Sequence, residues 1–143
     1  MKFENNMLLE FPSRSVNEGF ARSAVACFAS QLDPTVEELG DIKTAVSEAV
    51  TNCIVHAYPE GIGKITVRCK ILKGCVLDIV IKDRGVGIVD IERARQPMYT
   101  TGGDERSGMG FTIMETFMTD FRVKSVPGKG TTIHMLRELR KKK

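Results

Sequence analysis

The sequence has 143 residues, of which 42% are hydrophobic and 27% are charged. These values are typical of a globular protein, and we expect one domain across residues 1–143. No apolar run is long enough to cross a membrane, and the N-terminus lacks the apolar segment of a signal peptide, so we expect a cytoplasmic protein without a membrane partner. The net charge of +3 arises largely from residues 137–143. It gives no reason to expect direct binding to nucleic acid.

The four cysteines show no CxxC spacing, which argues against a disulfide framework or a zinc site. They are Cys27, Cys53, Cys69 and Cys75. Each lies within an apolar stretch, so we expect buried free thiols in a reducing compartment.

The chain opens with a short predicted strand at residues 7–11, "MLLEF". A first helix follows, and the spacing of Ser15 and Glu18 is that of a capping box at its start. The apolar side of this helix is expected to contain Val16, Phe20, Ala24, Cys27 and Phe28.

A second helix is predicted to follow "LDPT". Asp33 is the expected N-cap, and Pro34 suits the first helical position, where a missing N–H costs nothing. The helix is expected to run to about Ala57, where "YPEG" stops it. Its core stripe at helical period consists of Leu39, Ile42, Val46, Val50, Cys53 and Ala57.

The second half of the chain alternates strands, loops and short helices. The predicted strands are residues 64–72, 75–83, 121–126 and 131–139. The first two form a hairpin at Lys73-Gly74, and the last two flank the turn "PGKG". Helical pieces are expected at residues 90–95 and 109–118. The sum is an α+β fold, a mixed and mostly antiparallel sheet covered on one face by helices.

Glu48 and Asn52 lie one turn apart in the second helix, away from its core stripe. Exposed helix faces carry Glu and Asn routinely, so the pair alone does not establish a site. Its chemistry is nevertheless specific. A carboxylate can act as a base, and an amide oxygen suits Mg²⁺, a hard cation that prefers oxygen ligands.

Two glycine-containing motifs follow. Asp83 ends an apolar strand, where its carboxylate could accept a hydrogen bond from a base such as adenine, and Gly85 and Gly87 allow close backbone approach. Gly108 and Gly110 open a helix whose free N–H groups could hold phosphate. Each motif alone is equally well explained by a tight turn or a glycine-rich helix start.

The order of these motifs is more informative than any one of them. Glu-x-x-x-Asn, Asp-x-Gly-x-Gly, Gly-x-Gly and then Gly130-Thr131 resemble the GHKL (Bergerat) ATP-binding fold of gyrase and the histidine kinases. The stretches "SEAVTN", "ARQPMYTT" and "ERSGMGFTIMETFM" narrow the resemblance to the free-standing anti-sigma-factor serine kinases of bacteria. Within these, they resemble the sporulation branch that acts on sigma factor F. The resemblance covers the chain from about Leu8 to Leu136.

The resemblance implies ATP or ADP with Mg²⁺ as ligands, Glu48 as the catalytic base and Asn52 as the Mg²⁺ ligand. Asp83 would read adenine with Thr131 beside it, and Arg106 would reach the γ-phosphate or a partner. The implied nucleotide-binding residues are Asn52, Asp83, Gly85, Gly87, Thr100, Thr101, Arg106, Ser107, Gly108, Met109, Gly110 and Thr131. Residues 97–107 would form a lid over the phosphates. The lid departs from the family, in which a stiffer stretch, often with Lys or Pro, is expected.

The resemblance also implies a homodimer that binds and inhibits sigma factor F and phosphorylates a serine of a small anti-anti-sigma protein. Glu18 and Arg22 match positions that contact partners in this family. The N-terminal strand and first helix are the candidate dimer face. Three alternatives remain open from the sequence: a general-stress-type anti-sigma kinase, a nucleotide-binding protein that regulates by sequestration without transferring phosphate, and a small ATPase of this fold without a protein substrate.

Overall fold

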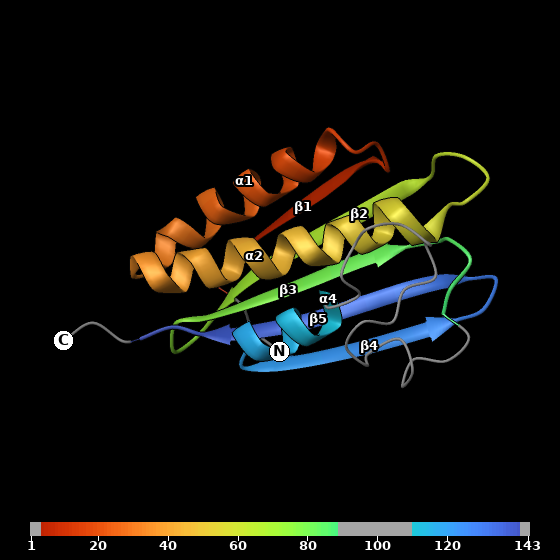
Figure 1. The fold of residues 1–143 in the computed structure, drawn as a ribbon. Helices are drawn as coiled ribbons and strands as arrows, with labels where there is room; N and C mark the ends of the chain where they lie inside the picture. Colours follow the sequence, from red (N-terminus) through yellow and green to blue (C-terminus); the bar gives the residue numbers. More distant parts are fainter. Residues whose placement is uncertain (1–3, 89–109, 141–143) are drawn as a thin grey trace.

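The computed structural model describes residues 4–88 and 110–140 as a five-stranded sheet covered on one face by three α-helices (Figure 1). The strand order is β1-β2-β3-β5-β4, and all four pairings are antiparallel. The strands are β1 (Asn5–Pro12), β2 (Lys64–Leu72), β3 (Val76–Asp83), β4 (Asp120–Val126) and β5 (Gly130–Glu138). The helices are α1 (Asn17–Ala29), α2 (Val36–Asn52) and α4 (Gly110–Phe117). The α+β prediction is confirmed, although the described sheet is wholly antiparallel rather than mixed.

The core lies between the sheet and the helices because side chains alternate in direction along each strand. The central strands β2, β3 and β5 turn their apolar residues inward. The fully buried members of this set are Ile65, Val67, Cys69, Leu77, Ile79, Ile81 and Met135. On the helical side of the core, α2 contributes Ile42, Val46 and Val50, each with no exposed surface. The predicted core stripe of the second helix is therefore confirmed at its centre.

The start of α2 differs from the prediction. Thr35, not Asp33, is the N-cap, and it forms a capping box with Glu38. Thr35 Oγ1 accepts from the Glu38 N–H at 3.0 Å, and Glu38 Oε1 accepts from the Thr35 N–H at 2.9 Å. Asp33 instead ends a 3₁₀ turn, η1 (Ser30–Leu32), in the left-handed conformation. The reciprocal bonds available only to Thr35 and Glu38 decide where the helix begins.

The start of α1 also differs from the prediction. No side chain caps α1, and Ser15 accepts the Glu18 N–H through its backbone carbonyl rather than through its hydroxyl. The helix is rotated relative to the predicted apolar side, so that Val16 and Phe20 are 79% and 53% exposed. Its buried side contains three alanines, Ala21, Ala26 and Ala29, together with Val25 and Phe28, so the prediction is confirmed for Phe28. Small side chains let α1 lie close to α2, which explains the rotation.

The cysteines are all free thiols, but they are not uniformly buried. Cys53 and Cys69 are buried as predicted. Cys27 is exposed because α1 is rotated, and Cys75 is half-buried in the β2–β3 turn, where its φ is 60°. The prediction of four buried thiols is therefore wrong for these two residues.

The shortest helix, α4, packs against α2. Arg137 on β5 holds the two helices together, because its Nη1 donates to Asp41 Oδ2 of α2 at 2.8 Å and to the Phe117 carbonyl of α4 at 2.6 Å. This tie fixes the end of α4 at Phe117 beside Asp41 in the first half of α2. Among the described residues, no helix is both long and apolar enough to cross a membrane.

Candidate functional site

The helix that carries Glu48 and Asn52 changes form immediately after Asn52. It continues as a π-helical turn, η2 (Cys53–Ala57), so the predicted helix end near Ala57 is confirmed although its π form was not predicted. Such turns are rare and often lie at functional sites. Glu48 and Asn52 are both half-buried, as is His56 in the π-helical turn.

Gly110, the first residue of α4, faces both polar side chains of α2. A Cβ atom on Gly110 would lie 3.2 Å from Glu48 Oε1 and 3.3 Å from Asn52 Nδ2. Three of the predicted site residues, from two helices, are thus brought together at the start of α4. Because Gly110 has no side chain, Glu48 and Asn52 approach the helix backbone directly, and their carboxylate and amide oxygens are ligands of the kind that Mg²⁺ prefers.

Asp83 and Thr131 meet at the end of β3. Asp83 is only 4% exposed, and its Oδ1 accepts from the Gly85 N–H at 2.9 Å and from the Thr131 N–H at 3.2 Å. Both donors hold the carboxylate in one orientation. A buried, fixed acceptor at a strand end is well suited to read the amino group of a base.

Ser125 on β4 is a site residue that the sequence did not indicate. Its hydroxyl accepts from the Ile88 N–H at 2.7 Å, lies 2.8 Å from Thr131 Oγ1 and lies 3.1 Å from the Gly130 carbonyl. The register of the β4–β5 hairpin places Ser125 opposite Thr131. Counting outward from the predicted turn "PGKG" could have paired the two residues.

Cys53 is a second neighbour of Asp83 that sequence reasoning treated only as core. Burial raises the pKa of the Cys53 thiol well above its usual value, and the charge and hydrogen bonding of Asp83 raise it further. The thiol therefore stays protonated beside the carboxylate. A protonated thiol here is a weak donor rather than a reactive nucleophile.

The glycines of the loop after Asp83 pack against protein backbone. A Cβ on Gly85 would collide with the Ala57 carbonyl, and a Cβ on Gly87, whose φ is 77°, would collide with the Val126 carbonyl. Both glycines are thus required by the fold. Their contact with a nucleotide stays a prediction.

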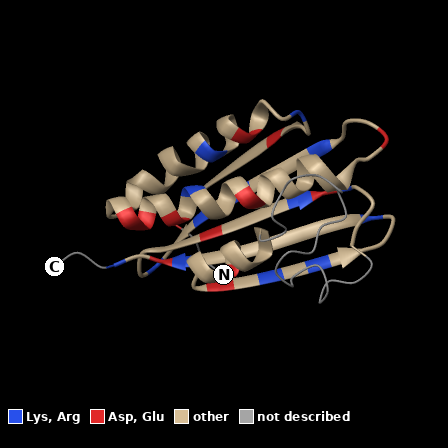
Figure 2. Ribbon diagram, viewed as in Figure 1, with Lys and Arg blue, Asp and Glu red and all other residues tan. Residues whose placement is uncertain are grey.

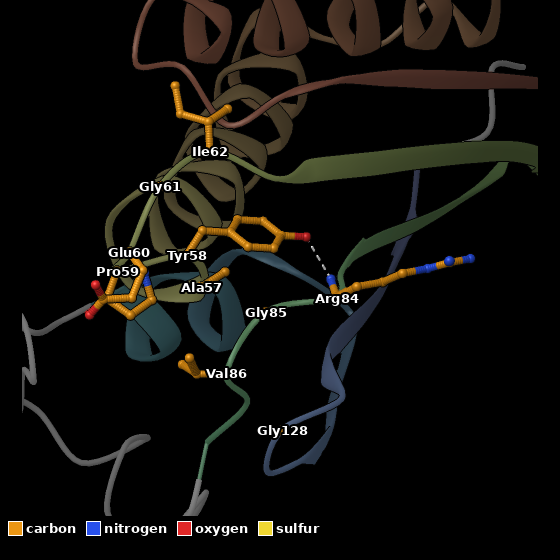
Figure 3. Close-up of a pocket in the computed structure, with 10 residues that line it drawn as sticks. All are labelled: Ala57, Tyr58, Pro59, Glu60, Gly61, Ile62, Arg84, Gly85, Val86 and Gly128. Carbon is orange, nitrogen blue, oxygen red and sulfur yellow. Dashed lines mark hydrogen bonds between the residues drawn. The ribbon is translucent and has the colours of Figure 1, made fainter.

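An open pocket of about 460 Å³ lies where η2 ends (Figure 3). It is lined by Ala57, Tyr58, Pro59, Glu60, Gly61, Ile62, Arg84, Gly85, Val86 and Gly128. Gly85 is the one predicted nucleotide residue among these lining residues. The pocket therefore adjoins the loop after Asp83, and Glu48, Asn52 and Gly110 are not among the residues that line it.

The two predicted partner-contacting residues lie on α1. Glu18 and Arg22 form an ion pair one turn apart, with 3.2 Å between Glu18 Oε2 and Arg22 Nη1. Figure 2 shows acidic and basic residues interspersed along the helices rather than gathered into one face of a single sign. The pair lies on α1, which packs against α2, whereas Glu48 and Asn52 face α4.

Six predicted nucleotide-binding residues lie outside the described residues. They are Thr100, Thr101, Arg106, Ser107, Gly108 and Met109. The predicted lid at residues 97–107 and the helical piece at residues 90–95 also lie outside them. Their roles stay predictions.

A family model and similar known proteins indicate the same kind of protein. Residues 11–137 match the model of the histidine kinase-like ATPase domain. The chain is 58% identical over 136 residues to the anti-sigma F factor of Caldanaerobacter subterraneus, covering 94% of each chain. It is 53% identical to the anti-sigma F factor of Geobacillus kaustophilus, covering 97% of this chain and 96% of the relative.

The fold is also similar to a solved structure of low sequence identity. The crystal structure of the RsbU and RsbW domains of a Mycobacterium tuberculosis protein superposes with a TM-score of 0.70. It is 17% identical, and the match covers 95% of this chain and 33% of that one. This likeness supports the shared fold alone.

Proposed function

We propose a function from the family to which this chain belongs, the anti-sigma F factors built on a histidine kinase-like ATPase domain. The protein is an anti-sigma factor that binds sigma factor F in the cytoplasm and keeps it from RNA polymerase. It is also a protein serine kinase that transfers the γ-phosphoryl group of ATP to an anti-anti-sigma protein.

The single observation that carries the kinase proposal is the approach of Glu48 and Asn52 on α2 to the start of α4. A Cβ atom on Gly110 would lie 3.2 Å from Glu48 Oε1 and 3.3 Å from Asn52 Nδ2. Asp83, buried and held by two N–H groups, lies at the end of β3. A carboxylate that positions the nucleophile and an amide oxygen that holds Mg²⁺ are groups that kinases use in phosphoryl transfer from ATP.

In the proposed mechanism, Asp83 accepts a hydrogen bond from the adenine amino group and so orients the nucleotide. Asn52 offers its amide oxygen to Mg²⁺, which would neutralise charge on the phosphates when bound. Glu48 takes the proton of the serine hydroxyl while the serine oxygen forms a bond to the γ-phosphorus. The bond between the γ-phosphorus and the oxygen of the β-phosphate breaks, and ADP leaves. Because the transition state is loose, positioning and charge stabilisation contribute more than the base does.

We propose that the protein acts as a homodimer through β1 and α1. Exposed apolar residues on these elements support this face: Leu8, Val16 and Phe20 are between 52% and 79% exposed. Glu18 and Arg22 lie on the same helix and would contact sigma factor F or the anti-anti-sigma protein.

The test is a phosphoryl-transfer assay. The protein is mixed with Mg²⁺, ATP radiolabelled at the γ-position and the anti-anti-sigma protein, and labelled residues are identified. Label on a serine of that protein is expected, and an unlabelled protein would overturn the kinase proposal. Nucleotide and sigma factor F binding without labelling would favour the alternative, regulation by sequestration alone.

A further inference from the structure

Tyr58, the residue that follows η2, joins three segments through one hydroxyl group. Its oxygen donates to the Lys64 carbonyl at the start of β2, with an O···O distance of 2.6 Å. The same oxygen accepts the Arg84 N–H at 2.7 Å, as the dashed line in Figure 3 shows. The end of the Glu48–Asn52 helix is thereby tied to the residue directly after Asp83.

The loop at residues 84–87 is fixed at several successive positions. Asp83 holds Gly85 at 2.9 Å, and Val86 donates to the Ala57 carbonyl at 2.8 Å. Val86 also accepts the Gly128 N–H at 2.8 Å. At Arg84, a side chain from outside the loop supplies the contact, and that side chain is Tyr58.

The Tyr58 ring is itself held in place from the opposite side. It packs so closely against Gly63 that a Cβ there would collide with the ring. Gly63 is anchored in turn by Ser13, whose Oγ accepts the Gly63 N–H at 3.0 Å and whose N–H donates to the Gly63 carbonyl at 2.8 Å. The hydroxyl therefore has little freedom to leave Arg84.

We infer that Tyr58 is a positioning residue for the nucleotide, because its hydroxyl fixes the backbone of Arg84 and so holds Asp83 and the loop in the geometry that receives adenine. This inference rests on the proposed function, since it concerns the same nucleotide. Tyr58 acts through Asp83 and the loop, and is not itself a catalytic residue.

The protonation state of Tyr58 agrees with this role. Partial burial raises the pKa of the phenol, and the nearby charge of Asp83 raises it further, against the lowering effect of the Arg84 N–H. The hydroxyl thus stays protonated at neutral pH and can donate to Lys64 while it accepts from Arg84.

The substitution Tyr58→Phe tests the inference, because it keeps the ring and removes both hydrogen bonds. We expect ADP affinity to fall and the KM for ATP to rise, each on the order of tenfold, which is the effect of losing one or two net hydrogen bonds. We expect kcat to stay within about twofold, because Glu48 and Asn52 lie in the preceding helix. Faster hydrogen exchange at the Arg84 amide would report the loosened loop without nucleotide.

Thr119→Val is the matched control. It also removes a side-chain hydroxyl that accepts a backbone N–H, that of Glu138 at 2.9 Å, but it leaves Tyr58, Gly63 and Arg84 untouched, so nucleotide affinity is expected to stay unchanged. Thermal unfolding of both variants separates lost stability from lost positioning. Equal nucleotide affinity in the wild type and Tyr58→Phe, or an equal loss in both variants, would overturn the positioning role. Absence of nucleotide binding by the wild type would instead overturn the proposed function.

Discussion

Two long helices, α1 and α2, lie side by side on the same face of the sheet, yet they bury different kinds of residue (Figure 1). The central helix α2 packs against α1 on one side and α4 on the other, and its large residues Ile42, Val46 and Val50 are wholly buried. The edge helix α1 buries mostly alanines and leaves Val16 and Phe20 exposed.

The difference shows that the position of a helix in the helical layer, central or at the edge, determines what the face turned away from the core contacts. On α2, the polar row of Glu48 and Asn52 turns toward α4 and is half-buried, so these residues face another helix rather than bulk water. On α1, the outer face carries apolar side chains instead. Phe20 is 53% exposed although its ring packs edge-on against Phe11 of β1, and such a surface is suited to a partner.

The largest expected effect concerns Asn52 on α2. We expect Asn52→Ala to abolish phosphoryl transfer to the anti-anti-sigma protein, because it removes the amide oxygen proposed to hold Mg²⁺. The assay is incorporation of label from γ-labelled ATP. The control is Lys43→Ala, an exposed position on the same helix, which should transfer at the wild-type rate. Ready transfer by Asn52→Ala would mean that α2 is not the site helix.

The second largest effect is expected at Glu48, on the rate of phosphoryl transfer. We expect Glu48→Ala to slow transfer by roughly 10²–10⁴-fold, the range for loss of a general base, with little change in ADP affinity. Single-turnover labelling measures the first quantity and calorimetric titration measures the second. Full kinase activity in this variant would show that Glu48 is not the base. Asn52 and Asp83 would still be the proposed nucleotide-binding residues.

A smaller effect, on dimer formation, is expected from a substitution on α1. It tests whether the exposed face of α1 has a role that α2 does not share. Phe20→Glu places a charge on the proposed partner face, and we expect the dimer to weaken by about tenfold or more. We expect the monomer to stay folded with some loss of stability, because the Phe20 ring also packs edge-on against Phe11, with 6.4 Å between the ring centroids. Sedimentation at several concentrations measures the dimer. Val36→Glu is the matched control, because Val36 is 91% exposed but lies at the start of α2. An equal loss in both variants would mean that α1 has no special surface.

The same comparison explains what could be predicted from the sequence. Large apolar residues at helical period placed the core side of α2 correctly, and the alternating strands around "KG" and "PGKG" gave both hairpins. The rotation of α1 could not be predicted, because three of its five buried residues are alanines, which look neutral in a hydrophobicity pattern.

The candidate site also contains some features that could be predicted from the sequence and some that could not. Glu48, Asn52, Asp83 and Gly110 were visible as motif residues. The supporting contacts were not, because they join residues far apart in the chain. Ser125 reaches Ile88 across 37 positions, and Tyr58 reaches Arg84 across 26. Such contacts are set by how strands and loops meet in space, and no local spacing encodes them.

The smallest expected effect tests the helix starts. Thr35→Ala removes the hydroxyl that caps α2, and we expect it to lower the free energy of unfolding by about 1 kcal/mol. Ser15→Ala at the start of α1 should change it by a few tenths of a kcal/mol at most, because Ser15 accepts the Glu18 N–H through its backbone carbonyl. Urea unfolding of both variants measures the difference. Equal destabilisation would mean that α1 is capped by the Ser15 side chain after all, and the contrast between the two helices would then be confined to their faces.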